Sequence, residues 1–337
     1  MVQTVKSLYQ AVNDRRSVRV FTDKQIEPEK LQRILETARN APQISPGSYS
    51  ITVVQDPKQK ADLRAASLRQ KYVETAPTDL VVLVNKYDLP SIQDATTATA
   101  YADLTTHVLG LGSVWIGAFH PDQVGQIVGA RPRQVPVAIL CCGEPEPREN
   151  VHRTPRRPLD DLITVIGRDG HSIPYHGIGS TMLGSRLFFD VIERRISTRK
   201  FTGKPIEEAK IHRIIESANR APSAGNLQAY DLMLFTDPTL MKIFMRTALG
   251  QKTNGEGALL IVMANQLRSS IKYRERGAEL YCLQDATIAA AYADLAAQDV
   301  GLGTNMITKF NIPNVAALIG ANRYQIPIAV LAIGNIA

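Results

Sequence analysis

The segment Arg15-Arg16-Ser17-Val18-Arg19 concentrates side chains that bind phosphate groups. A guanidinium group holds phosphate oxygens in a bidentate geometry, and a serine hydroxyl adds a further hydrogen-bond donor. The segment follows an amphipathic stretch, residues 2–13, which predicts a short opening helix, so the arginines are expected on a turn. A solvated surface cluster of arginines is the alternative interpretation.

A second polar segment, Pro222-Ser223-Ala224-Gly225-Asn226, follows the end of a predicted helix. Gly225 permits a tight backbone, and Ser223 and Asn226 offer short polar side chains to a ligand. Ordinary turns are rich in the same residue types, so a simple connection between two elements is the alternative.

Both segments belong to a domain that is written twice along the chain. Residues 14–42 align with residues 194–222 at an offset of 180, and residues 93–112 align with residues 284–303 at an offset of 191. The alignment continues from VPVAILCCG in copy one to IPIAVLAIG in copy two. A duplicated domain of this size predicts two compact domains in a chain of 337 residues.

The hydrophobic pattern predicts the same order of elements in both copies. At residues 27–40 the apolar side chains fall at helical spacing, and the run DLVVLVN has the length of a buried strand. In copy one we expect helices at 27–40, 61–72, 91–109 and 121–128, strands at 49–55, 79–85 and 135–142, and a strand or extended segment at 113–119. In copy two we expect helices at 207–219, 238–249 and 278–300 and strands at 231–235, 259–265 and 326–333.

Together these motifs resemble the FMN-dependent nitroreductase family. The motifs are R-x-S-x-R-x-F, a helix that ends in A-P-S-A-G-N-x-Q, a late G-L-G, and a V-P-V strand that leads to a Pro/Arg-rich tail. The resemblance covers nearly all of both copies, and only the connector between them lies outside it. In that family two identical subunits share two FMN sites at their interface, so the chain resembles such a dimer fused into one polypeptide.

The resemblance also implies which residues bind the cofactor. The arginine that matches Arg19 lies near the pyrimidine edge of the flavin, and Arg153 and Arg156 match the late phosphate contacts, with Arg156 the better match. No acid–base pair and no metal ligand are expected. The residues expected to bind FMN are Arg15, Arg16, Ser17, Arg19, Trp115, Ile116, Gly117, Arg153, Arg156, Pro222, Ser223, Ala224, Asn226 and Gln228.

The second of the two expected sites departs from the family pattern. Arg195, Ser197 and Arg199 remain, but residues 43–46 (Gln-Ile-Ser-Pro) replace the polar turn, and residues 306–309 (Met-Ile-Thr-Lys) stand over the segment that begins at Trp115. One site between the two copies therefore matches the family and its twin is degraded. We expect one FMN per chain.

The resemblance implies an α+β, nitroreductase-like fold with two helix-flanked, mainly antiparallel sheets that form an intramolecular pseudo-dimer. The expected domains are residues 1–160, a crossing strand and connector at 161–190, and residues 191–337. Family members send their tail across to the partner's sheet, so residues 144–166 are expected to cross onto copy two. The chain is expected to be a monomer that acts as a pseudo-dimer, and further oligomerisation is left open.

Composition excludes several other classes of protein. The net charge is +7, but lysine and arginine are dispersed along the chain, which does not indicate a nucleic-acid-binding face. No apolar run approaches the roughly 20 residues that span a bilayer, and the N-terminal residues lack the apolar core of a signal peptide. Three cysteines do not make a disulfide framework, so a cytoplasmic location is expected. Because no apolar run is long enough to span a bilayer, no membrane partner is expected.

Other motifs indicate packing rather than chemistry. The Gly-Leu-Gly motifs at 110–112 and 301–303 follow helices and lead to strands, which is the opposite order to a Rossmann phosphate loop. His171 and His176 lie in a coil without a nearby cysteine, which favours a pair of loop histidines over a metal site. Cys141-Cys142 lies in an apolar strand and is expected to pack in the core.

The resemblance implies an FMN-dependent oxidoreductase that takes hydride from NAD(P)H and reduces a small nitroaromatic, quinone or related electron-poor substrate by a ping-pong mechanism. The cofactor carries the redox chemistry, which explains why no acid–base dyad is visible. The alternatives are a flavin-binding or storage protein with little turnover, and a specialised dehydrogenase or dehalogenase of the same family.

Overall fold

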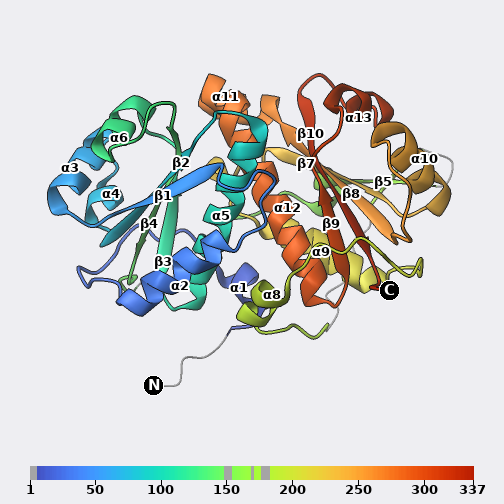
Figure 1. Ribbon diagram of the computed structural model, residues 1–337, viewed down its shortest axis with the longest axis horizontal. Coiled ribbons are helices and arrows are strands. Elements are labelled where there is room, and N and C mark those ends of the chain that lie inside the picture. Colours follow the sequence, from blue (N-terminus) through green and yellow to red (C-terminus); the bar gives the residue numbers. More distant parts are fainter. Residues whose placement is uncertain (1–5, 148–153, 168–170, 176–182) are drawn as a thin grey trace. The chain divides into compact units, whose positions relative to one another are not determined.

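The computed structural model describes residues 6–147, 154–167, 171–175 and 183–337, which group into two compact units (Figure 1). Within these residues, unit 1 comprises residues 14–147, and unit 2 comprises residues 6–13 together with the described residues from 154 onward. Unit 2 therefore holds copy two, the connector and the opening helix. No helix in the described part of the chain is both long and apolar enough to cross a membrane.

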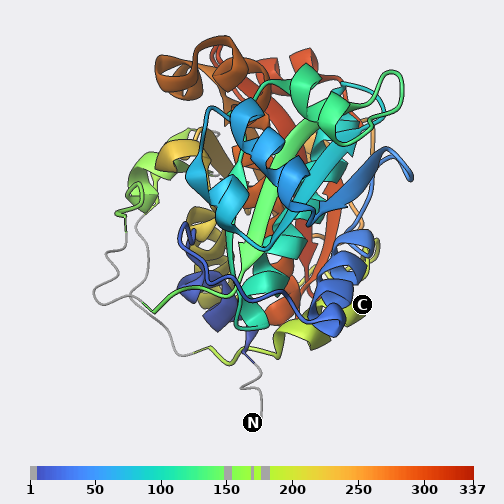
Figure 2. The ribbon, with the colours of Figure 1, turned by 90° about the vertical axis from the view of Figure 1, so that its left-hand side faces the viewer.

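Unit 1 is a four-stranded antiparallel sheet in the order β1-β2-β4-β3, with helices on both faces (Figure 2). The central strand β2 is buried along its whole length, and α5 lies almost wholly buried against the sheet. The elements are α2 Pro28–Arg39, β1 Tyr49–Val54, α3 Pro57–Ala66, α4 Lys71–Thr75, β2 Thr78–Val84, α5 Leu89–Val108, β3 Gly112–Ile116, α6 Pro121–Ile127 and β4 Val135–Gly143.

Alternation along the strands divides the core of unit 1 into two layers. Val81 and Ile139 face a cluster that includes Leu63 of α3, Val73 of α4 and Val124 of α6. The neighbouring strand residues point to the opposite face of the sheet, where α5 packs. The continuous apolar run of β2 follows from this arrangement, because a strand covered by helices on both faces has no solvent side.

Unit 2 contains a six-stranded sheet in the order β6-β5-β7-β8-β10-β9. All its strand pairs are antiparallel except β5 with β7. Its helices are α1 Leu8–Asp14, α7 Leu159–Leu162, α8 Phe188–Arg194, α9 Glu208–Arg220, the 3-10 turn η1 Ala224–Asn226, α10 Pro238–Ala248, α11 Gln266–Arg276, the π-helix η2 Gly277–Tyr281, α12 Cys282–Asp299 and α13 Ile312–Leu318. Its strands are β5 Ile163–Ile166, β6 Ser172–Pro174, β7 Tyr230–Phe235, β8 Ala258–Asn265, β9 Gly303–Ile307 and β10 Gln325–Gly334.

The segment expected to cross onto copy two, residues 144–166, ends in β5, Ile163–Ile166, which joins the sheet of unit 2. It pairs in parallel with β7, from Ile163 opposite Leu232 to Ile166 opposite Phe235. Arg157 anchors the segment that precedes it, because its Nη1 donates to the carbonyl oxygens of Gln228 and Tyr230 at 3.1 and 2.6 Å. The same guanidinium group lies 3.0 Å from the Asp231 carboxylate.

The opening helix α1 pairs with its counterpart α8 through a short antiparallel bridge. The amide of Leu8 donates to the carbonyl of Arg186, and the amide of Phe188 donates to the carbonyl of Lys6. The bridged residues, Ser7 and Leu187, differ by the repeat offset of 180, so the bridge joins equivalent positions of the two copies. This bridge is therefore locally two-fold symmetric.

Two predicted helices were wrong in detail. The helix expected at 61–72 is two helices, because Leu68 and Arg69 adopt φ angles of 53° and 59° that end α3 after Ala66. The helix expected at 278–300 begins as the π-helix η2 and continues as α12. The change of repeat offset from 180 to 191 marks an insertion between β8 and α12, and α11 fills it.

Candidate cofactor-binding site

The polar turn of unit 2 has a left-handed backbone at three positions. The φ angles are 56° at Gly225, 58° at Asn226 and 46° at Gln228. Only glycine adopts this region without cost, and left-handed residues cluster where the surrounding structure holds a functional segment in place. A Cβ atom at Gly225 would also collide with the hydroxyl of Tyr273 and the ammonium group of Lys272, both on α11.

One buried carboxylate holds both ends of this turn. Asp285 of α12 accepts hydrogen bonds from the amide of Ala224 at 2.8 Å and from the amide of Ala229 at 3.2 Å. Within the turn, the Ser223 hydroxyl oxygen accepts from the amide of Gln228 at 3.0 Å. Burial raises the pKa of Asp285 to about 7, although these amides and the charge of Arg156 oppose the increase.

Sequence reasoning missed Asp285, but the repeat contains a signal for it. Asp94 is its counterpart at offset 191, and it holds the replacement turn of copy one through the amides of Ile44 and Ser45, at 2.6 and 2.9 Å. The hydroxyl of Ser48 donates to the same carboxylate at 2.8 Å. A buried aspartate shared by both copies therefore anchors two turns of different sequence.

Two residues predicted to bind the cofactor form hydrogen bonds to other parts of unit 2. Gln228 is fully buried, accepts from the amide of Arg157 at 2.6 Å, and donates to the carbonyl of Asn219 at 3.1 Å. Asn226 donates from Nδ2 to the carbonyl of Pro155 at 2.8 Å. In this structure both side chains therefore hold the tail onto the turn.

The segment of unit 1 that is predicted to bind phosphate, Arg15–Arg19, follows α1 and lies against β3. The amide of Val18 donates to the carbonyl of Ser113 at 2.8 Å. Gly112 is required beside it, because a Cβ atom there would collide with the Val18 side chain. This close approach gives the second glycine of the Gly-Leu-Gly motif its physical role.

The four polar side chains of that segment differ in exposure. Arg16, Ser17 and Arg19 are exposed, whereas only 5% of the Arg15 side chain is accessible. Nη1 of Arg15 lies 3.5 Å from the Asp103 carboxylate, and among the described residues its buried Nε has no hydrogen-bond partner.

Copy two repeats this ion pair. Nη1 of Arg195 lies 3.4 Å from the carboxylate of Asp294, to which the hydroxyl of Thr304 also donates. Burial raises the pKa of Asp294, and the charge of Arg195 opposes that increase. Because both copies have the pair, it belongs to the fold and does not distinguish a complete site from a degraded one.

The remaining predicted residues lie in β3 and in the tail. Trp115 is half-buried, Ile116 belongs to the core of unit 1, and Gly117 follows the end of β3. Arg156 donates to the carbonyls of Ala221 and Arg220, at 2.9 and 3.1 Å, where it satisfies the C-terminal end of α9. Arg153 lies outside the described residues.

These residues fit a phosphorylated flavin in their chemistry. The unpartnered Nε of Arg15 and the exposed Arg16, Ser17 and Arg19 are donors suited to an anion. The turn from Ser223 to Asn226 is held in one conformation before any ligand arrives, which lowers the ordering cost of binding.

Other candidate chemistry is absent from the part of the chain that the structure describes. No group of three histidine, cysteine, aspartate or glutamate residues there could hold a metal ion; His171 is exposed, and His176 lies outside the described residues. Cys141, Cys142 and Cys282 are free and buried, and burial raises the pKa of each thiol. A buried thiol with a raised pKa is a poor nucleophile.

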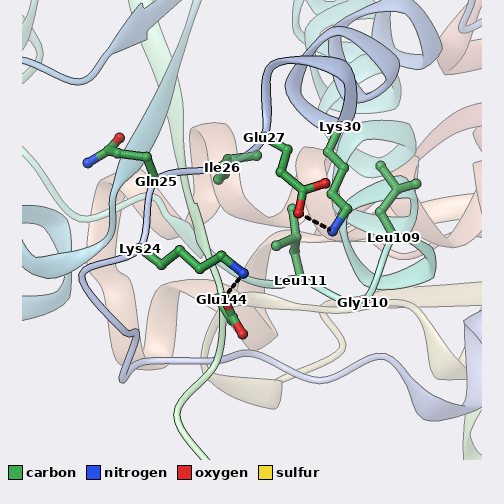
Figure 3. Close-up of a pocket in the computed structure, with 9 residues that line it drawn as sticks. All are labelled: Lys24, Gln25, Ile26, Glu27, Lys30, Leu109, Gly110, Leu111 and Glu144. Carbon is green, nitrogen blue, oxygen red and sulfur yellow. Dashed lines mark hydrogen bonds and ion pairs between the residues drawn. The ribbon is translucent and has the colours of Figure 1, made fainter. Parts of the chain in front are cut away.

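A cavity of about 200 Å³ in unit 1 does not contain any of the predicted residues (Figure 3). Its two cations are already paired, since Lys24 lies 3.1 Å from Glu144 and Lys30 lies 3.3 Å from Glu27. The cavity therefore does not fit a phosphate group. Its lining residues are Lys24, Gln25, Ile26, Glu27, Lys30, Leu109, Gly110, Leu111 and Glu144.

Both halves of the chain match known protein families. The family described as "Putative TM nitroreductase" matches residues 7–173. The family described as "Nitroreductase family" matches residues 192–256 and 242–335. The two matches fall on the two copies of the repeat.

Curated relatives align with about half of the chain. The chain is 27% identical over 175 residues to the "Putative NADH dehydrogenase/NAD(P)H nitroreductase" of Archaeoglobus fulgidus, which covers 48% of the chain and 97% of that relative. It is 26% identical over 195 residues to the FMN reductase (NAD(P)H) of Bacillus subtilis strain 168, which covers 50% of the chain and 77% of that relative. The relative in Archaeoglobus fulgidus thus has the length of roughly one copy, whereas the relative in Bacillus subtilis extends beyond the part that matches.

Two solved structures are similar to one half of the chain. The FMN-dependent nitroreductase from Clostridium difficile R20291 has a TM-score of 0.39 at 25% identity, covering 42% of this chain and 90% of that one. Nitroreductase A from Vibrio parahaemolyticus has a TM-score of 0.44 at 24% identity, covering 52% of this chain and 78% of that one.

Proposed function

The chain belongs to the nitroreductase family, with one family domain in each half, and we propose that it is an FMN-dependent NAD(P)H oxidoreductase. FMN is its cofactor and NAD(P)H its electron donor, as the names of the relatives in Archaeoglobus fulgidus and Bacillus subtilis indicate. Its oxidants are small electron-poor molecules such as nitroaromatics and quinones. The observation that carries the proposal is the family match in both halves, together with a strained polar turn in the second.

The residues of this chain bind and orient the cofactor. Arg16 and Ser17 are exposed donors for the phosphate, and the Nε of Arg15 adds a buried one. The positive charge of Arg19 stabilises the negative charge that reduction adds to the flavin ring. Ser223 offers a hydroxyl group from a turn that does not need to reorganise.

Bound FMN supplies the redox chemistry by accepting hydride from NAD(P)H and passing it to the oxidant. We expect ping-pong kinetics, because the donor and the oxidant would react with bound FMN one after the other. We also propose, from the sequence alone, that the segment Arg15–Arg19 and the turn Ser223–Asn226 bind the same FMN molecule.

Anaerobic stopped-flow mixing of the purified yellow protein with NADH or NADPH tests the proposal. Prompt bleaching of the flavin absorbance, followed by reoxidation on adding a quinone, is the expected result. A flavin that stays oxidised with both donors would refute the enzyme and favour a flavin-storage protein. A colourless protein that does not take up added FMN would refute the cofactor as well.

A further inference from the structure

The polar turn of unit 2 keeps its strained conformation because side chains hold it at several points. Gly225 and Asn226 of the turn, and Gln228 just after it, have positive φ angles, and such residues persist only where their surroundings over-determine them. Asp285 is the contact that reaches both ends, because its two carboxylate oxygens accept from the amides of Ala224 and Ala229. The strained residues lie between those two amides.

The charge of Asp285 is what allows this double contact. An ionised carboxylate is an acceptor at both oxygens, whereas a protonated one presents a hydroxyl donor at one of them. Asp285 is 2% exposed and Ala229 is fully buried, so the amide of Ala229 has no water to replace a lost acceptor, whereas the amide of Ala224 is only partly buried. A buried amide without an acceptor destabilises the conformation that buries it.

We propose that Asp285 is a positioning residue for FMN, which holds the turn Ser223–Asn226 in its binding conformation through the amides of Ala224 and Ala229. The inference rests on the proposed function, because it assigns this turn to the FMN site. Asp285 itself does not contact the cofactor in this assignment. It acts through the backbone of the turn.

Asp94 supplies a matched control within the same chain. It occupies the equivalent position of copy one, is equally buried, and accepts from two backbone amides and one hydroxyl group. Burial raises its pKa too, against the pull of those three donors. Its turn, residues 43–46, lacks the family's polar sequence, so loss of Asp94 should disturb the fold as much and FMN binding far less.

The pH dependence of binding gives a second, independent readout. The groups that face Asp285 are Arg156 of the tail, Tyr230 of β7 and Cys282 of α12. Burial raises the pKa of Tyr230 and that of Cys282 to about 12, so only Asp285 of this group titrates near neutrality. As the pH falls through about 7, Asp285 takes up a proton and releases an amide. FMN affinity should therefore fall as the pH falls.

The test compares Asp285→Asn with Asp94→Asn in the full chain. FMN is removed, and the dissociation constant for added FMN is measured by quenching of flavin fluorescence at pH 6.5, 7.2 and 8.0. At pH 8.0, Asp285→Asn should weaken binding about tenfold or more, the loss typical of one charge-assisted contact. Asp94→Asn should stay within about twofold of the unsubstituted chain by the same measure.

The change of FMN affinity with pH distinguishes a positioning role of Asp285 from a general loss of stability. The unsubstituted chain and Asp94→Asn should share one pH profile, which includes any titration of the FMN phosphate, and Asp285→Asn should lose the part due to Asp285. Equal losses in both variants, or an Asp285→Asn profile that matches the unsubstituted chain, would overturn the proposal. If Asp285→Asn does not fold, Asp285→Glu displaces the carboxylate by one methylene, and undiminished affinity in that variant would overturn it. Failure of the unsubstituted chain to bind FMN would refute the proposed function instead.

Discussion

The buried residues Lys60, Asp79 and Cys141 form a triad in unit 1. Replacing one member of this triad and replacing all three should change the stability of the protein in opposite directions. The ammonium group of Lys60 lies 3.0 Å from the carboxylate of Asp79 and donates to the carbonyl of Val73 at 3.1 Å. Cys141 is the residue opposite Asp79 in the neighbouring strand. Burial raises the pKa of Asp79 to about 6, and the charge of Lys60 only partly offsets it.

Copy two shows which apolar residues can replace this triad. Pro57 and Pro238 begin the matching helices, which places Met241 at the position of Lys60. The strand registers place Leu259 at the position of Asp79, since Leu259 lies opposite Phe235 in β7 as Asp79 lies opposite Val54 in β1. By the same registers Ala332 stands at the position of Cys141. All three replacements are buried in the core of unit 2.

Removing one partner and removing the whole triad should therefore have opposite effects. Lys60→Met leaves a buried carboxylate without its cation, which costs about 3–5 kcal/mol. The triple variant Lys60→Met, Asp79→Leu, Cys141→Ala should be neutral or more stable by about 1–4 kcal/mol, because well-packed apolar residues avoid the cost of desolvating two charges. The smaller alanine makes room for the larger leucine, as Ala332 does beside Leu259.

The assay uses Trp115, the one tryptophan of the sequence, which lies on β3 in unit 1 and so reports the unfolding of that unit. Urea unfolding is followed by its fluorescence at pH 7.5 and pH 5. An acidic group whose pKa is raised in the folded state makes the folded protein less stable as the pH rises through that pKa. The loss of unfolding free energy caused by Lys60→Met should therefore be larger at pH 7.5 than at pH 5. A triple variant destabilised as much as Lys60→Met would refute the reasoning, and so would a cost of Lys60→Met that is the same at both pH values.

Three further predictions concern the cofactor and the turn. Released flavin, measured by absorbance against protein concentration, should approach one per chain, and a reproducible ratio of two would show that the turn of copy one also serves a site. Arg19→Ala should lower FMN affinity about tenfold in a fluorescence titration, whereas the matched Arg199→Ala should leave it unchanged; equal losses would contradict the one-site assignment. Gly225→Ala should weaken FMN binding more than Gly47→Ala, because both glycines have positive φ but only at Gly225 would a Cβ atom displace neighbouring side chains, those of Tyr273 and Lys272; equal binding in the two variants would contradict a role for this contact with α11.

The sequence by itself determined the duplication, the family and most of the elements. Apolar residues at helical spacing predicted α2, and an apolar run of strand length predicted β2. The long helix α5 and the strands β1 and β4 were also predicted, although α5 is buried on all sides and has no periodic apolar face. The crossing of residues 144–166 onto copy two was predicted from the resemblance, and the end of that segment, Ile163–Ile166, is β5 in the sheet of unit 2. The polar turn was visible as an unmatched segment within an otherwise constant alignment.

Partners of individual polar side chains were decided only by the tertiary structure. Arg156 looked like a phosphate contact, yet its guanidinium group lies on the carbonyls at the end of α9. Gln228 stood in the family motif and is fully buried among protein partners. Residue type fixes what a side chain can donate or accept, but folding decides which of many possible partners comes within 3 Å.

The anchors of the site show the same limit most clearly. Asp285 lies 61 residues from Ala224 and 56 from Ala229 in the sequence. The residues next to Asp285 therefore do not predict that its carboxylate accepts hydrogen bonds from this turn. Lys60 and Asp79 are likewise charges within an apolar core, where local hydropathy predicts exposure. The spacing of residues predicts helices and strands because the hydrogen bonds and the buried faces of these elements are periodic. A buried charged side chain needs partners, and only the packing of the sheet and helices brings those partners together.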